Sequence, residues 1–258
     1  MDDPLVLAAL FVGTAALYSS VGHAGASGYL ALMGLAGLPQ AVMKPTALVL
    51  NLVVASIVTI RFGLAGLIAW RRLIPFLLGS VPLAFAGGAI SLPGSLYRIL
   101  VGIVLLLAAA RLARTADTAA AEAGGADGGD PSPTPTPPSA PLPVAIAVGA
   151  GVGLLAGLTG TGGGIFLTPI LLFTGWATTR MAAGMSAAFI LANSAAGLAG
   201  NLVSLRSVPP QIPLWAGAVV VGALIGSSLG TRRLGTPALR RLLALVLLVA
   251  GLKLVFLP

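Results

Sequence analysis

Two glycine-rich segments hold the residues of this 258-residue chain that are best placed for chemistry. They are residues 22–28 (GHAGASG) and residues 160–164 (GTGGG), and each separates two short apolar runs. A glycine loop that leads into a short helix presents backbone N–H groups and the positive end of the helix dipole, which bind an anion without a charged side chain. Neither segment ends in the Gly-Lys-Ser/Thr of a Walker loop. Close packing of helices is the alternative use of these glycines.

His23, inside the first segment, is the only histidine in the chain. Its reference pKa of about 6.5 lies near physiological pH, so it is a candidate for proton coupling or for direct contact with an anion. A neutral histidine that satisfies interrupted backbone is the other interpretation. Because the chain has one histidine and no cysteine, multi-histidine metal sites, disulfides and thiolate chemistry are excluded.

Polar side chains in the neighbouring apolar runs complete the candidate site. Asn51 lies in the third run of the chain, and Ser186 and Asn193, seven residues apart, share one face of the counterpart helix. Such side chains either face a cavity or join helices, where an amide contributes about 0.6 kcal/mol. No catalytic or metal-binding residue is assigned. The candidate substrate-binding residues are Gly22, His23, Gly25, Ser27, Asn51, Gly160, Thr161, Gly162, Gly163, Gly164, Ser186 and Asn193.

The composition identifies the class of protein. Hydrophobic residues make up 57% of the chain and charged residues 8%, against roughly 25% charged residues in soluble domains, so the chain is an integral membrane protein. Its long apolar segments contain no carboxylate, the group that cation sites and proton relays in membranes normally use. Cation transport and carboxylate acid–base catalysis are therefore disfavoured. The acidic residues are Asp2, Asp3, Asp117, Glu122, Asp127 and Asp130.

The apolar runs predict an all-α, polytopic fold in two halves. Residues 115–142, rich in Ala, Gly and Pro, predict a disordered cytoplasmic linker. The linker separates a first transmembrane repeat, residues 1–114, from a second, residues 143–258. In each half, three of five runs approach the roughly 20 residues of a spanning helix. The runs are 5–21, 25–38, 45–61, 73–91, 96–113, 143–158, 164–177, 182–204, 212–231 and 238–257.

The two halves are related in sequence. Residues 20–38 (SVGHAGASGYLALMGLAGL) match residues 158–176 (LTGTGGGIFLTPILLFTGW). An inverted second copy places ten Lys and Arg residues on the cytoplasmic side and four outside, whereas a copy in the same orientation gives seven on each side; the positive-inside rule favours inversion. Inverted repeats whose helices are broken at glycine-rich segments of this kind are typical of transporters. Gly149, Gly153 and Gly157, spaced four apart, predict close helix packing.

The basic residues are interpreted mainly as determinants of membrane orientation. The net charge of +8 does not indicate nucleic-acid binding, because the basic residues are scattered singly or in pairs between apolar runs. Lys44 and Arg180 occupy equivalent positions beside the glycine-rich segments. They either attract anions or fix orientation, and we favour orientation.

The motif GTGGGIFLTPILL (160–172), the duplicated halves and the Pro-rich linker resemble the TauE/SafE sulfite and organosulfonate exporter family. The resemblance covers nearly the whole chain apart from the linker. It implies a protein of the bacterial plasma membrane that moves sulfite, sulfoacetate and related small anions. The first half departs from the usual pattern, because Ala24 and Ala26 replace glycines, His23 lies inside the loop, and Ala31 stands where the second half has Pro169.

We therefore expect a multi-pass secondary transporter of a small anion that works by alternating access, without a cofactor or a nucleic-acid partner, in the lipid bilayer of the plasma membrane. The chain contains no ATP-binding motif. A membrane-embedded enzyme with His23 as general base and a structural or assembly protein are the alternatives. The anion, the direction of transport, the coupling ion and homo-oligomer formation stay open, as does whether the first two segments of each half cross fully or are re-entrant.

Overall fold

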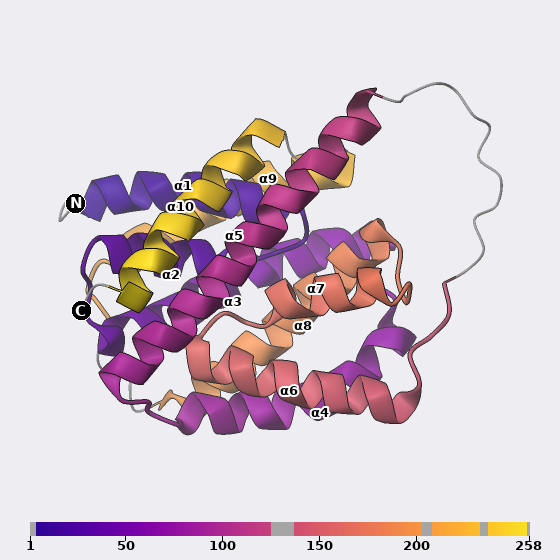
Figure 1. The fold of residues 1–258 in the computed structure, drawn as a ribbon, viewed down its shortest axis with the longest axis horizontal. Coiled ribbons are helices and arrows are strands. Elements are labelled where there is room, and N and C mark those ends of the chain that lie inside the picture. Colours follow the sequence, from indigo (N-terminus) through magenta and orange to yellow (C-terminus); the bar gives the residue numbers. More distant parts are fainter. Residues whose placement is uncertain (1–3, 125–136, 203–207, 233–236, 257–258) are drawn as a thin grey trace.

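The chain folds as a bundle of helices (Figure 1). The computed structural model describes residues 4–124, 137–202, 208–232 and 237–256, which contain ten helices and no strand. Five helices are long and apolar enough to cross a membrane, so the predicted all-α, polytopic fold is confirmed. The helices are α1 (Pro4–Ser20), α2 (Ala26–Leu35), α3 (Gln40–Leu64), α4 (Trp70–Ala89), α5 (Gly94–Gly124), α6 (Leu142–Thr159), α7 (Gly164–Phe173), α8 (Thr179–Gly200), α9 (Ile212–Arg232) and α10 (Pro237–Phe256).

α5 extends beyond the apolar run that predicted it. The run ends at residue 113, whereas the helix continues to Gly124, into the segment predicted as disordered linker. Residues 115–123 include five alanines. Alanine has the highest helix propensity, so the helix continues beyond the end of the apolar run. Residues 125–136 of the predicted linker lie outside the described residues.

The order of helix lengths repeats between the halves. In each, a helix of 17 or 18 residues precedes one of 10 residues and three of at least 20. Corresponding helices α3 and α8 pack antiparallel, with Asn51 beside Ser194 and Leu48 beside Gly197. α5 and α10 also run side by side in opposite directions (Figure 1). In an inverted repeat, corresponding helices run antiparallel. Inversion of the two halves as whole units stays a prediction.

Glycines make the closest helix contacts. α6 packs along α4, and a Cβ atom at Gly149, Gly153 or Gly157 would overlap a backbone carbonyl oxygen of α4. α9 approaches α1 in the same way through Gly222 and Gly226. A short distance between two helices strengthens the dispersion attraction between them. In lipid this attraction holds helices together, because the hydrophobic effect does not act between them there. The packing role predicted for the α6 glycines is confirmed.

Gly153→Ala is expected to destabilise the protein by about 1–3 kcal/mol, the usual cost of forcing extra atoms into a packed interior. The new methyl group would meet the backbone carbonyl of Ser80, which α4 holds in place. Gly151→Ala is the matched control on the same helix, because beyond the local backbone of α6 no described atom lies within 4 Å of its Cβ position. Thermal unfolding in detergent measures both variants, and equal melting temperatures would contradict the packing role.

The short helix α2 folds back against α1. Its 10 residues extend about 15 Å at 1.5 Å per residue, half of the roughly 30 Å hydrocarbon core. The hydroxyl of Tyr18 in α1 lies 2.6 Å from Ser27 Oγ in α2, and Gly28 packs against Thr14, so the two helices are antiparallel. This geometry favours a re-entrant hairpin over two full crossings, with the glycine-rich segment at its tip.

Candidate functional site

The two glycine-rich segments meet inside the bundle. We name residues 21–25 the first join, between α1 and α2, and residues 160–163 the second join, between α6 and α7. Corresponding glycines have positive φ: Gly22 and Gly25 at 78° and 97° in the first join, Gly160 and Gly163 at 81° and 82° in the second. Glycine adopts this region without a steric penalty. The glycines thus end one helix and start the next in buried surroundings, so α2 and α7 both begin at the joins.

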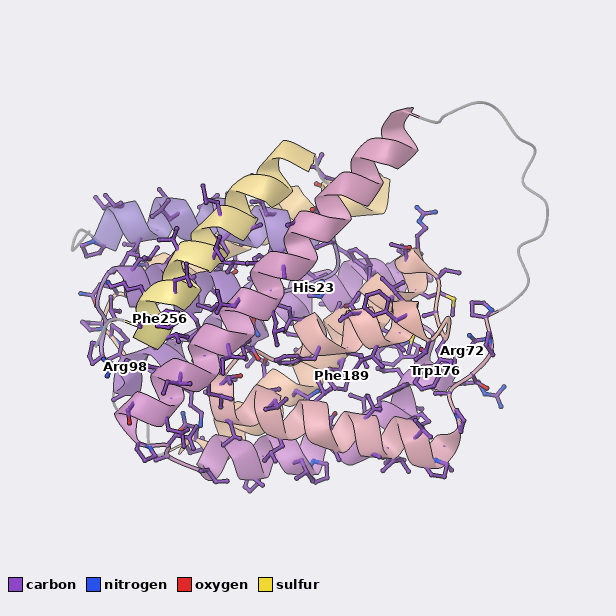
Figure 2. The ribbon with its side chains drawn as sticks, viewed as in Figure 1. His23, Arg72, Arg98, Trp176, Phe189 and Phe256 are labelled. Atoms are coloured by element: carbon purple, nitrogen blue, oxygen red, sulfur yellow. The ribbon has the colours of Figure 1, made fainter. Side chains whose placement is uncertain are left out.

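His23 connects the first join to the second half of the chain. Its Nε2 lies 3.1 Å from the carbonyl oxygen of Gly164 and 3.1 Å from Thr168 Oγ1, and its Nδ1 lies 3.1 Å from the carbonyl oxygen of Val21. The residue is 5% exposed and lies in the middle of the bundle (Figure 2). A carbonyl oxygen thus lies at each ring nitrogen and accepts a hydrogen bond from it when that nitrogen carries a proton.

A chain of hydroxyl groups continues from His23. Thr168 Oγ1 lies 2.6 Å from Ser186 Oγ and 2.9 Å from the carbonyl oxygen of Gly164. Because a hydroxyl both donates and accepts, Thr168 donates to a neutral ring nitrogen or accepts from a protonated one. Thr168 lies within an apolar run and is not among the residues predicted from the sequence. The available signal was its spacing of four residues from Gly164, which places it on the helix face that carries the join.

Asn51 ties the two joins together from α3. Its Oδ1 accepts a hydrogen bond from the N–H of Ala26 at 3.1 Å. Its Nδ2 donates to the carbonyl oxygen of Thr161 and to Ser194 Oγ, each at 3.3 Å. The side chain is fully buried, so a single amide satisfies the start of α2 and the backbone of the second join together.

The other predicted residues are buried as well, but two of them bond only locally. Ser27 pairs with Tyr18 in its own half at 2.6 Å. Asn193 Nδ2 donates to the carbonyl oxygen of Phe189 in its own helix at 2.8 Å, and its Oδ1 is buried without a partner among the described residues. The structure therefore places His23, Gly164 and Ser186 in one hydrogen-bonded group and Asn51 and Thr161 in a second, and it leaves Ser27 and Asn193 outside both.

The first turns of α2 and α7 present buried N–H groups at the joins. In α2, Ala26 is paired, and within the described part of the chain no acceptor meets the N–H of Ser27 or Gly28. In α7 the same holds for the N–H groups of Gly164 and Ile165. The first N–H groups of any helix lack partners within the helix. Buried at two neighbouring helix starts, they are donors for an anion.

Side chains of α8 close the second join. A Cβ atom at Gly164 would overlap Ile190, and one at Gly163 would lie 2.9 Å from Phe189 Cε1. No space is left at these glycines for a solute. Side chains of α8 therefore pack directly against the backbone of the second join and the start of α7.

Two cavities lie at opposite ends of the α4–α6 pair. The Lys44 cavity, of about 280 Å³, includes Lys44, Tyr97 and Asn201 in its wall. The Arg72 cavity, of about 180 Å³, includes Arg72 and Trp176, whose carbonyl oxygen accepts a bond of 3.2 Å from the Arg72 guanidinium. Figure 2 shows Arg72 and Trp176 together at one end of the bundle, far from Arg98 at the other. Among the described residues, the wall of the Lys44 cavity contains one basic residue, that of the Arg72 cavity contains Arg71 and Arg72, and neither contains an acidic residue.

Known proteins resemble the chain over nearly its full length. Residues 5–254 match the family model described as sulfite exporter TauE/SafE. The chain is 38% identical over 257 residues to a protein of Sinorhizobium fredii named "Probable membrane transporter protein y4hK", and the match covers 99% of this chain and 100% of that protein. No solved structure matches the chain.

Proposed function

The chain belongs to the TauE/SafE sulfite exporter family, and from this premise we propose that it is a permease that moves a sulfur oxyanion or a sulfonate across the plasma membrane. Its family and its five apolar helices make it a multi-pass membrane protein.

The meeting of two helix starts in a buried region without carboxylates is the observation that carries the proposal. The N–H groups of α2 and α7 converge on the joins, where His23 adds a group able to carry positive charge. Asn51 fixes the distance between the joins. In surroundings of low dielectric, N–H dipoles of this kind bind an anion strongly without a permanent ion pair.

Alternating access would use the two repeats, residues 1–114 and 143–258, as the moving bodies. Antiparallel packing of corresponding helices supports an inverted arrangement. The Lys44 and Arg72 cavities, at opposite ends of the bundle, provide the approaches from the two sides. The positive-inside tally places the Arg72 cavity and the connection between the repeats on the cytoplasmic side.

The contacts of His23 do not support an enzyme. A catalytic histidine normally has a third group, such as a carboxylate, that orients it toward a nucleophile. The ring of His23 instead meets two backbone carbonyl oxygens and the hydroxyl of Thr168. We therefore propose transport without covalent chemistry or a cofactor.

Flux measurements with purified protein in liposomes test this function. Sulfite, thiosulfate, methanesulfonate and acetate are loaded separately, and we expect saturable, protein-dependent flux of at least one sulfur anion and little flux of acetate. Empty liposomes are the control. Product formation without flux would establish the enzyme alternative, and neither activity would leave a structural or assembly role.

A further inference from the structure

Lys44 is a buried cation with no carboxylate partner among the described residues. It is 8% exposed, and its Nζ donates to the carbonyl oxygens of Gly87, Gly88 and Ile90 at 3.2, 3.0 and 3.1 Å. These bonds cap the C-terminal end of α4, whose dipole offsets about half of a unit charge. All acidic residues of the chain lie at its N-terminus or within residues 117–130. Part of the ammonium charge is therefore left without a counter-charge from the apolar segments.

The Lys44 cavity places space and a second donor beside this charge. Its volume of about 280 Å³ is several times the roughly 30 Å³ that one water molecule occupies. Asn201 is 7% exposed, and its Nδ2 is buried with no acceptor among the described residues. A buried donor left unpaired is costly, and an acceptor bound in the cavity would remove that cost. Ser91 and Tyr97 also line the cavity.

We propose that the Lys44 cavity binds one small oxyanion, through the positive charge of Lys44 and the N–H of Asn201. The Lys44 ammonium already donates three hydrogen bonds to carbonyl oxygens, so it supplies charge rather than a directed bond. The ligand class is therefore set by size and negative charge, and it includes sulfate-like anions and sulfonates. The cavity adjoins the second join, where a Cβ atom at Gly160 would lie 3.4 Å from Lys44 Cγ, and anion binding in the cavity can be tested without transport.

The absence of cysteine from the chain permits a test that reports from the cavity alone. Ser91→Cys puts a single thiol in the cavity wall at an exposed position. Anionic sulfonatoethyl and cationic trimethylammonioethyl methanethiosulfonates each transfer an alkylthio group to the thiolate and release methanesulfinate. After correction for their rates with a free thiol, we expect the anionic reagent to react about tenfold faster, because a cationic cleft concentrates anions. Methanesulfonate, which is unreactive, should slow that reaction.

Lys44→Gln in the Ser91→Cys protein should remove both the preference for the anionic reagent and the protection by methanesulfonate. Lys253→Gln is the matched control, because Lys253 also caps a helix, donating to the carbonyl oxygens of Gly34 and Leu35 at 3.1 and 3.0 Å, and it lines neither the Lys44 cavity nor the Arg72 cavity. The control should retain both effects.

Asn201→Leu offers an independent test that leaves the cation in place. It should keep the preference for the anionic reagent and weaken protection by methanesulfonate several-fold. The proposal is overturned if Lys44→Gln retains both effects, if Lys253→Gln loses them to the same extent, or if the parent Ser91→Cys protein shows neither. The labelling is done in detergent and needs no flux, so failure of the proposed permease function would appear separately.

Discussion

Replacing Asn51 by leucine is expected to abolish anion flux and to lower the free energy of unfolding by about 2–6 kcal/mol. The substitution leaves the N–H of Ala26 and the carbonyl oxygen of Thr161 buried without their partner, and each such group costs about 1–3 kcal/mol. It also removes the bridge that sets the spacing of the joins. Unfolding in detergent measures the stability, and sulfite efflux from liposomes measures the flux.

Asn193→Leu is the matched control for stability. Asn193 donates only to a carbonyl oxygen of its own helix, and its Oδ1 has no partner in the described part of the chain, so its loss should cost no more than about 1 kcal/mol. Equal destabilisation by the two substitutions would refute the bridging role of Asn51.

Asn51→Asp separates geometry from charge. The variant keeps an acceptor for the N–H of Ala26 but places a negative charge between the joins, where it repels an anion in surroundings of low dielectric. We expect a folded protein without flux at neutral pH. Flux at the wild-type rate would show that the joins do not bind the transported anion.

Much of the fold follows from rules that act along the chain. In lipid, backbone polar groups must be satisfied within the protein, so long apolar runs become helices. The glycine-rich segments interrupt those runs because Gly22, Gly25, Gly160 and Gly163 adopt positive φ. These features are local, and residue type alone reveals them. The end of α5 is the exception, since alanine propensity carries the helix past its apolar run.

The partners of individual side chains do not follow from the same rules, because they depend on packing between the halves. Ser27 resembles a site residue by its position and instead bonds to Tyr18. Lys44 and Arg180 each follow one of the two matched segments, yet Lys44 is buried at the end of α4 and Arg180 is exposed. Thr168 belongs to an apolar run, and only the approach of His23 gives it a role. Side-chain contacts between distant segments therefore could not be predicted from the sequence patterns.

His23→Ala is expected to abolish or uncouple anion flux while leaving membrane assembly intact. The reason is that the ring contacts the carbonyl oxygens of Val21 and Gly164 and the hydroxyl of Thr168, so its loss removes the contact that His23 makes between the two joins. Methanesulfonate efflux from liposomes measures the flux, and the amount of folded protein recovered from membranes measures assembly.

His23→Gln and Thr168→Val distinguish the charge of His23 from its hydrogen bonds. Glutamine keeps a donor and an acceptor but cannot become a cation, so retained flux would assign the role of His23 to hydrogen bonding and lost flux would assign it to the imidazole itself. Valine at position 168 removes the hydroxyl that lies 3.1 Å from Nε2 and 2.6 Å from Ser186 Oγ, so flux should fall because this hydroxyl no longer positions the ring. If His23→Ala transports at the wild-type rate, the histidine only satisfies the backbone of the joins, and the anion is held by N–H dipoles alone.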